Sequence, residues 1–169
     1  MRIYRITTRH SQLTDVSTPH TPSDVQGIGT NVNIPVWAYT QIIQGTWVLA
    51  PAGASGTNQD FHGFIHNTSN TNGDEIHYQV YLSTGTWKLI MLVVKFSDAG
   101  ITDVYIDNTK IATFDLYNST EQLNTIVSQD NISISQDGLK TLKFKLNGHN
   151  ANSGGYKLDI YGICFMRTA

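Results

Sequence analysis

Histidine and acidic side chains are the residues of this sequence that could perform metal or acid–base chemistry. His62 and His66 fall on one face of a predicted strand, but their four-residue spacing separates them by roughly 13 Å, too far to share an ion. His66 and His77 could instead oppose each other on neighbouring strands. Asp74 and Glu75 are adjacent in the chain, so their carboxyl groups point to opposite faces and do not form an acid–base pair. We therefore predict no metal site and no cofactor.

Known catalytic motifs are missing from the sequence. It contains no GxSxG elbow, no HExxH pair, no phosphate-binding loop and no GxGxxG turn. Its Ser, His and Asp residues are scattered, without a framework that would align a nucleophile with a base. We therefore predict no catalytic residue and expect that the protein is not an enzyme.

Sugar binding is the more serious option. Sugars are held by aromatic rings that stack on their C–H faces and by planar amides or carboxylates that hydrogen-bond their hydroxyl groups. The sequence has three Trp and eight Tyr, together with abundant Asn. The candidate glycan contacts lie in predicted loops or at strand ends, and they are Tyr117, Asn118, His149, Asn150 and Asn152.

Composition and charge argue against several classes of protein. Charged residues make up 14% of the chain, whereas hydrophobic residues make up 40%, which argues against disorder. The net charge of −2 provides no basic field for nucleic-acid binding. No apolar run reaches the ~20 residues that cross a bilayer, and the N-terminus lacks a signal-peptide core. We expect the protein to be made in a host cytoplasm and not to associate with a membrane. Cys164 is the single cysteine, so it forms no internal disulfide, and we expect it to be a buried small hydrophobe.

The elements that would position these residues are strands, and the clearest runs from Thr86 to Phe96. This segment lacks Gly and Pro and is rich in Trp, Ile, Val, Leu and Phe. Both of its faces are apolar, so a second sheet, another subunit or a folded-back segment should cover the face that the core does not. Asp107-Asn108-Thr109 then predicts a tight hairpin turn.

Further strands follow at roughly ten-residue spacing, with no helical periodicity. In the segment Asp74 to Leu82, Ile76, Tyr78, Val80 and Leu82 should face the core. Gln122 to Val127 and Asn131 to Ser135 are predicted as two strands joined by a turn at 128–130. Trp47 and Trp87, at strand starts, are expected in the core. The count favours an all-β fold, an antiparallel β-sandwich of jelly-roll type.

The first 33 residues differ from the rest and predict an extended N-terminal arm ahead of a sandwich domain over residues 34–169. The arm is rich in Thr, Ser, Pro and Gly, and it has no helical pattern. We expect it to anchor the protein to a neighbouring subunit or a larger assembly. The residues expected to do so are Arg2, Ile3, Tyr4, Arg5, Ile6 and Arg9.

Two segments carry a resemblance to a known family: GTWKLIMLVVKFSDAGITDVYIDNTKIATFDLYNST and DGLKTLKFKLNGHNANSGGYKLDIYGICFMRT. Their Gly85-Thr86-Trp87 strand start, the Asp107 hairpin and the loop before Tyr156 resemble jelly-roll modules in virion proteins of tailed bacteriophages, such as head-decoration proteins, head fibres and tail-fibre tips. Those modules are similar in build to carbohydrate-binding modules. The motifs are structural, so the resemblance carries over no functional residue.

Two main functions remain open from the sequence. The first is a non-enzymatic virion protein, a homotrimer that decorates a capsid or forms a head fibre, binds other virion proteins through its arm and lies on the particle surface. The alternative is a glycan- or receptor-binding module of a tail fibre or a carbohydrate-binding protein, which would contact a cell-surface glycan. Light scattering would separate them, because the first predicts a trimer and the second a monomer of 18.7 kDa.

Overall fold

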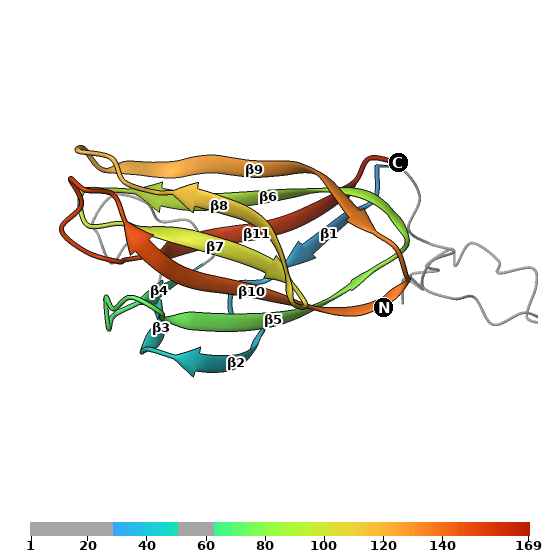
Figure 1. Ribbon diagram of the computed structural model, residues 1–169, viewed down its shortest axis with the longest axis horizontal. Helices are drawn as coiled ribbons and strands as arrows, with labels where there is room; N and C mark the ends of the chain where they lie inside the picture. The colour runs from blue at the N-terminus through green and yellow to red at the C-terminus, as the bar shows by residue number, and fades with distance from the viewer. Residues whose placement is uncertain (1–28, 51–62) are drawn as a thin grey trace, which may run out of the picture.

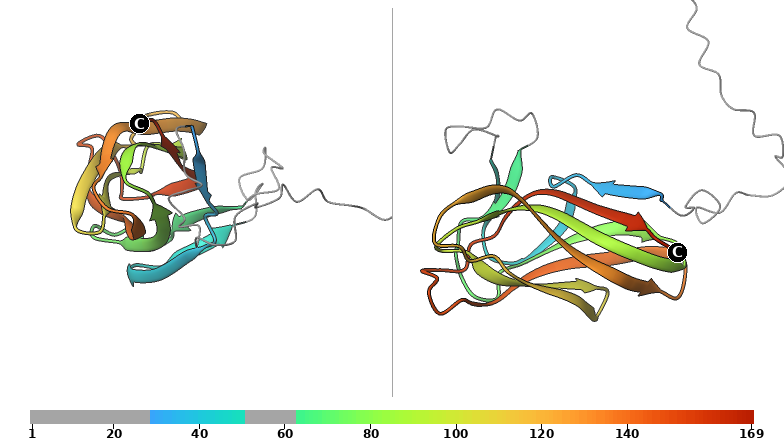
Figure 2. Two further views of the ribbon diagram at one scale, coloured as in Figure 1. Left: turned by 90° about the vertical axis from the view of Figure 1, so that its right-hand side faces the viewer. Right: turned by 90° about the horizontal axis from the view of Figure 1, so that it is seen from above.

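The computed structural model describes residues 29–50 and 63–169 of the chain, and these form two stacked antiparallel sheets without a helix (Figures 1 and 2). Sheet A has the strand order β3-β4-β11-β6-β9, with β1 also paired to β11. Its strands are β1 (Asn31–Ile34), β3 (Trp47–Ala50), β4 (Phe64–Asn67), β6 (Gly85–Lys95), β9 (Gln122–Ile134) and β11 (Asp159–Arg167). The all-β jelly-roll prediction is confirmed.

Sheet B has the order β2-β5-β10-β7-β8 and covers the inner face of sheet A. Its strands are β2 (Tyr39–Gln44), β5 (Glu75–Leu82), β7 (Gly100–Ile106), β8 (Thr109–Asp115) and β10 (Gly138–His149). The predicted hairpin joins β7 to β8, and Asp107 there has φ 53°, a left-handed conformation that suits a tight turn.

The core lies between the sheets and is filled by alternate residues of each strand. Trp87, Leu89, Met91 and Val93 of β6 are completely buried, as are Ile76, Tyr78 and Leu82 of β5, so the predicted inward faces are confirmed. Two large polar-tipped aromatic side chains in the core have their polar atoms paired. The Trp87 indole donates to the Ser83 carbonyl at 2.9 Å, and the Tyr78 hydroxyl donates to the Val36 carbonyl at 2.9 Å. Trp47 is also buried, as expected.

Strand β9 corrects one prediction. Residues 122–134 form one strand of 13 residues rather than two strands with a turn at 128–130. Ser128 and Gln129, the predicted turn residues, pair with Ile90 and Leu89 of β6. The chain does not reverse direction here. Instead the pairing of β9 with β6 shifts register at two β-bulges, near Asn124 and Asn131, which both adopt positive φ.

Strands β1 and β4 share one edge of β11. Strand β1 pairs with residues 163–166, and β4 pairs with residues 159 and 160. Strand β1 begins at Asn31, so the sandwich includes residues just ahead of the predicted domain start at residue 34. The predicted anchoring residues Arg2, Ile3, Tyr4, Arg5, Ile6 and Arg9 lie outside the described residues. Within the described ranges, no helix has the length and hydropathy of a membrane span.

Candidate functional site

A hollow of about 480 Å³ opens on the outer face of sheet A, where β4, β6, β9 and β11 come together. We call it the β4–β11 hollow. The side chains that define its chemistry are Phe64, His66, Phe96, Lys157, Asp159 and Tyr161. They come from segments far apart in the sequence, so only the folded sheet brings them together.

The β11 side of the hollow follows from strand alternation. Lys157, Asp159 and Tyr161 occupy every second position, so they share the outer face while Leu158 and Ile160 are buried in the core.

A buried amide fixes β4 against this segment. The Asn67 side chain is completely buried, and its amide donates to the Tyr156 carbonyl and to Asp74, each at 3.0 Å. Its carbonyl oxygen accepts from the Leu158 backbone N–H at 2.6 Å. His66 consequently lies directly opposite Asp159 in the strand pairing.

Aromatic rings form one part of the hollow. The Phe64 and Tyr161 rings are 5.0 Å apart between centroids and inclined by 34°, and Phe64 also lies 5.2 Å from the His66 ring. Phe96 lines the hollow from the end of β6, with the Lys157 amine 6.0 Å from its ring centroid. Rings in this arrangement offer an apolar surface beside polar groups.

Asp159 is the carboxyl group whose environment differs most from water. Burial raises its pKa to about 7; Lys157 opposes this shift, whereas Asp98 and Glu121 add to it. Its Oδ1 atom is buried and accepts no hydrogen bond from the described residues, and the His66 Nδ1 atom is 3.9 Å away, beyond hydrogen-bond distance. The Asp159 side chain as a whole is 18% exposed, so its carboxyl group is a candidate for accepting a hydrogen bond from a ligand hydroxyl in the hollow.

The other charged groups of the hollow complete a mixed polar rim. Lys157 pairs with Asp98 at 2.6 Å. Burial lowers the pKa of His66, and the positive charge of Lys157 lowers it further, so the imidazole is neutral at pH 7. The hollow can thus accept and donate hydrogen bonds next to apolar rings, which suits a polyhydroxylated ligand.

The structure corrects the predicted histidine geometry. His66 lies in sheet A and His77 in sheet B, so the two do not oppose each other on neighbouring strands. His77 instead contacts Glu75 at 2.6 Å. His62 lies outside the described residues. Among residues 29–50 and 63–169, no three His, Cys, Asp or Glu side chains are grouped to hold a metal ion.

Asp74 and Glu75 separate to opposite faces, as predicted. Asp74 is buried and accepts hydrogen bonds from Asn67, Ser69 and Thr71, which hold the turn before β5. Glu75 lies on the outer face of sheet B, where it contacts Lys145 at 3.1 Å.

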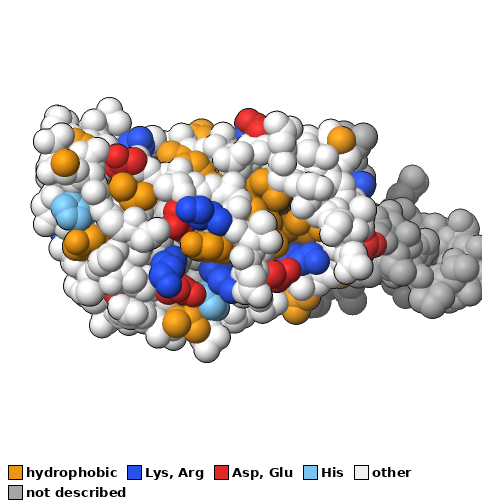
Figure 3. All heavy atoms as spheres, in the orientation of Figure 1, with side chains coloured by type: hydrophobic (Ala, Val, Ile, Leu, Met, Phe, Trp, Pro, Cys, Tyr) orange, Lys and Arg blue, Asp and Glu red, His pale blue; other side chains and the backbone are white. Residues whose placement is uncertain are grey.

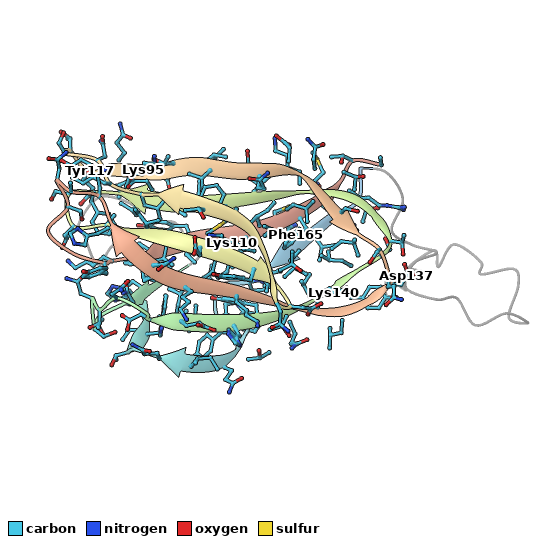
Figure 4. The ribbon with its side chains drawn as sticks, viewed as in Figure 1. Lys95, Lys110, Tyr117, Asp137, Lys140 and Phe165 are labelled. Atoms are coloured by element: carbon cyan, nitrogen blue, oxygen red, sulfur yellow. The ribbon has the colours of Figure 1, made fainter. Side chains whose placement is uncertain are left out.

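Tyr117, one of the predicted glycan contacts, lies at the end of the sandwich opposite the end that carries Asp137 (Figure 4). Asn150 donates to Asp115 at 2.7 Å, which joins its loop to the segment leading to Tyr117. The His149 ring packs edge-on against Tyr156 at 4.8 Å.

The amides of this loop cluster mainly serve the local backbone. Asn118 donates to the Thr120 carbonyl at 2.6 Å, and the Asn152 N–H donates to the Asn150 side chain at 3.0 Å. A glycan role for the five predicted residues stays a prediction.

The β4–β11 hollow was missed by the sequence reasoning, although one signal could have found part of it. The closing strand is apolar on both faces, and a charged residue such as Asp159 is unexpected there. Its spacing from Lys157 and Tyr161 places all three on one face.

Cys164 also differs from its prediction. It is half-buried on the outer face of sheet A rather than fully buried, and burial raises the pKa of its thiol.

Comparison with known proteins identifies the fold. No model of a protein family matches the sequence, and a search of curated proteins finds no match. A Paenibacillus xanthan lyase aligns with a TM-score of 0.65 at 19% identity, over 81% of this chain and 13% of the lyase. This chain therefore corresponds to a small part of that enzyme.

Two further similar structures are nearly whole domains. The CBM36-1 domain of a multidomain xylanase from the hindgut metagenome of Trinervitermes trinervoides aligns with a TM-score of 0.61 at 15% identity, over 83% of this chain and 99% of the domain. A carbohydrate-binding module CBM36 in complex with calcium and xylotriose aligns with a TM-score of 0.53 at 17% identity, over 80% of this chain and 97% of the module.

These likenesses concern the fold, since all three identities are below 20%. They give no support to the capsid role or to the homotrimer expected from the sequence. They do support the expected similarity in build to carbohydrate-binding modules. The chain has the jelly-roll fold that carbohydrate-binding modules use.

Proposed function

We propose that this protein is a non-catalytic glycan-binding module that holds its ligand in the β4–β11 hollow. The observation that carries the proposal is the combination there of aromatic rings with a carboxyl group whose Oδ1 atom accepts no hydrogen bond from the described residues. A sugar ring has an apolar C–H face and hydroxyl groups at its edge, so it matches both parts of the hollow at once. The fold shared with carbohydrate-binding modules supports this alternative over the virion role.

The roles of individual residues follow from their positions. Tyr161 and Phe96 would stack on a sugar ring, with Phe64 supporting Tyr161 from below. Asp159 would accept a hydroxyl hydrogen bond, and the Lys157 amine would donate one without leaving Asp98. Each well-made polar contact of this type contributes roughly 1 kcal/mol, and binding of a short glycan in the micromolar range needs several together.

Isothermal titration calorimetry against xylan, mixed-linkage β-glucan and mannan tests the proposal, with Tyr161→Ala as the site variant. Tyr105→Ala is a matched control, because Tyr105 is also half-buried but lies on the outer face of sheet B. We expect one of these glycans to bind, Tyr161→Ala to weaken it at least tenfold, and Tyr105→Ala to leave it unchanged. Equal losses in both variants, or no binding to any glycan in a wider array, would contradict the proposal.

A further inference from the structure

A second, apolar groove lies beside the β4–β11 hollow on the same face of sheet A. It has a volume of about 410 Å³, and we call it the β1–β6 groove. Its defining residues are Pro35, Trp37, Ile90, Leu92, Gly162 and Cys164. None of its lining residues is a carboxylate, lysine, arginine or histidine.

The groove and the hollow adjoin along two paired strands. On β6, Leu92 of the groove is followed two residues later by Val94 of the hollow. On β11, Gly162 of the groove directly follows Tyr161 of the hollow. Gly162 pairs with Leu92, so the boundary between the two cavities falls at this pair. From Ile90 to Phe96 the combined surface extends roughly 20 Å along β6.

Gly162 has no side chain at the boundary between the groove and the hollow. A Cβ atom at Gly162 would meet only the Leu92 Cβ, at 3.6 Å, an ordinary contact, and its φ is outside the left-handed region. The backbone therefore does not require glycine at this position. The consequence of glycine is that β11 contributes no side chain at this pair, where Leu92 is the residue on β6.

Trp37 supplies a second aromatic surface. It follows β1, at the place where the chain leaves sheet A to begin β2 in sheet B, and its side chain is 66% exposed. A large aromatic side chain left this exposed is unusual unless it contacts a partner. Trp37 on the groove and Tyr161 in the hollow thus provide two separate rings along one surface.

We propose that the groove and hollow together bind an internal stretch of an extended, uncharged glycan chain, with Trp37 and Tyr161 stacking on different sugar units. This inference rests on the proposed function and goes beyond it by naming the class of ligand. Charge favours an uncharged chain, because the hollow contains Asp98, Glu121 and Asp159 against the single Lys157, and the groove adds no cation. A second copy of the protein is the competing occupant of an apolar face.

The test measures affinity against chain length. Xylo-, cello- and manno-oligosaccharides from disaccharide to hexasaccharide are titrated into the wild type, Trp37→Ala and Gly162→Val. Leu139→Ala is the matched control, since Leu139 is also 66% exposed but lies on β10 of sheet B. Thermal melts confirm that each variant is folded, and two independent variants guard against a local disturbance in either.

We expect the wild-type affinity to rise at least tenfold from disaccharide to hexasaccharide. In Trp37→Ala and Gly162→Val that gain should be lost while disaccharide affinity is kept, and Leu139→Ala should match the wild type. Oligogalacturonates of the same lengths should bind at least tenfold more weakly.

Three results would overturn the inference. The first is an affinity that does not depend on chain length, or an increase in affinity with chain length that Trp37→Ala and Gly162→Val both retain. Either outcome would leave the proposed function intact. The second is a preference for oligogalacturonates. The third is a dimer in light scattering that Gly162→Val dissociates, which would assign the groove to self-association. Absence of binding at every length would instead contradict the proposed function itself.

Discussion

The outer faces of the two sheets each hold a buried or largely buried aspartate, Asp103 on sheet B and Asp159 on sheet A, and their environments are opposite. Asp103 accepts hydrogen bonds from Thr113 and from Asn147, and its carboxylate pairs with Lys110 at 3.4 Å. Burial alone would raise its pKa, but these bonds and the lysine charge outweigh burial and lower it. The Oδ1 atom of Asp159 has no such donor among the described residues, and the pKa of Asp159 rises to about 7.

We infer that this difference separates a structural surface on sheet B from the proposed binding surface on sheet A. On sheet B the charged groups satisfy one another, as the mixed lysine and acid side chains near the middle of that face show (Figure 3). On sheet A the buried Oδ1 atom of Asp159 has no donor among the described residues, and such a carboxyl group is costly to ionise.

Replacement of Asp159 by Asn should stabilise the protein at alkaline pH. The pKa of Asp159 is raised from its ordinary 3.8 to about 7, so wild-type stability from this group is fully present below pH 4 and is lost as the pH rises through 7. At pH 8 the free-energy cost of ionising this carboxyl in the folded protein amounts to at most about 4 kcal/mol. Urea unfolding should show this gain for Asp159→Asn at pH 8 and almost none at pH 4. A variant no more stable at pH 8 would contradict the assigned environment.

Replacement of Asp103 by Asn should have the opposite sign. The variant loses charge-assisted hydrogen bonds and turns an amide toward the donors of Asn147 and Lys110, a cost of roughly 2 kcal/mol. Because the pKa of Asp103 is lowered, the wild-type contribution is present above its unfolded value of 3.8 and is lost as the pH falls through the folded pKa. The loss measured by urea unfolding should therefore be full at pH 7 and smaller at pH 3. A pH-independent loss would show that packing, not charge, dominates at this site.

Glycan affinity should rise with pH if Asp159 accepts the sugar hydroxyl as a carboxylate. With a pKa of about 7, its ionised fraction grows about tenfold between pH 6 and pH 8. Of the groups that face it, His66 has its pKa lowered by burial and by the charge of Lys157, which favours its neutral form. Calorimetry at both pH values should show the increase in the wild type and a flat profile in Asp159→Asn. The same slope in both proteins would remove Asp159 from the binding site.

Replacement of Lys110 by Ala should have the smallest effect. The lysine is 50% exposed, and pairs of this kind contribute roughly 0.5 kcal/mol because solvent screens them. Thr113 and Asn147 still hold Asp103 in the variant. Thermal unfolding should shift by only a few degrees, and glycan affinity should not change. A large loss of glycan affinity would place the ligand on sheet B, and the outer face of sheet A would then not be the binding surface.

The fold was largely predictable because local patterns define it. Alternation in residues 76–82 and along β6 identified the inward faces, and the Asp107 turn identified a hairpin, since each depends on neighbours in the chain. Strand β9 was divided wrongly because Asn, Ser and Asp favour turns locally, whereas pairing with β6 holds this segment extended. The second apolar face of β6 was recognised, but within the described residues no further sheet covers it.

The sequence by itself determined which residues are apolar, which alternate and where the chain turns, and hence two antiparallel layers around one core. Only the tertiary structure decided that Phe64, Phe96 and Tyr161 would meet, that His66 would face Asp159, and that His77 would lie in the other sheet. Strand periodicity depends on contacts a few residues apart, and it assigns each side chain to a face. The order of strands within a sheet depends on pairings between distant segments, such as Asn31 with Met166, which local pattern does not encode.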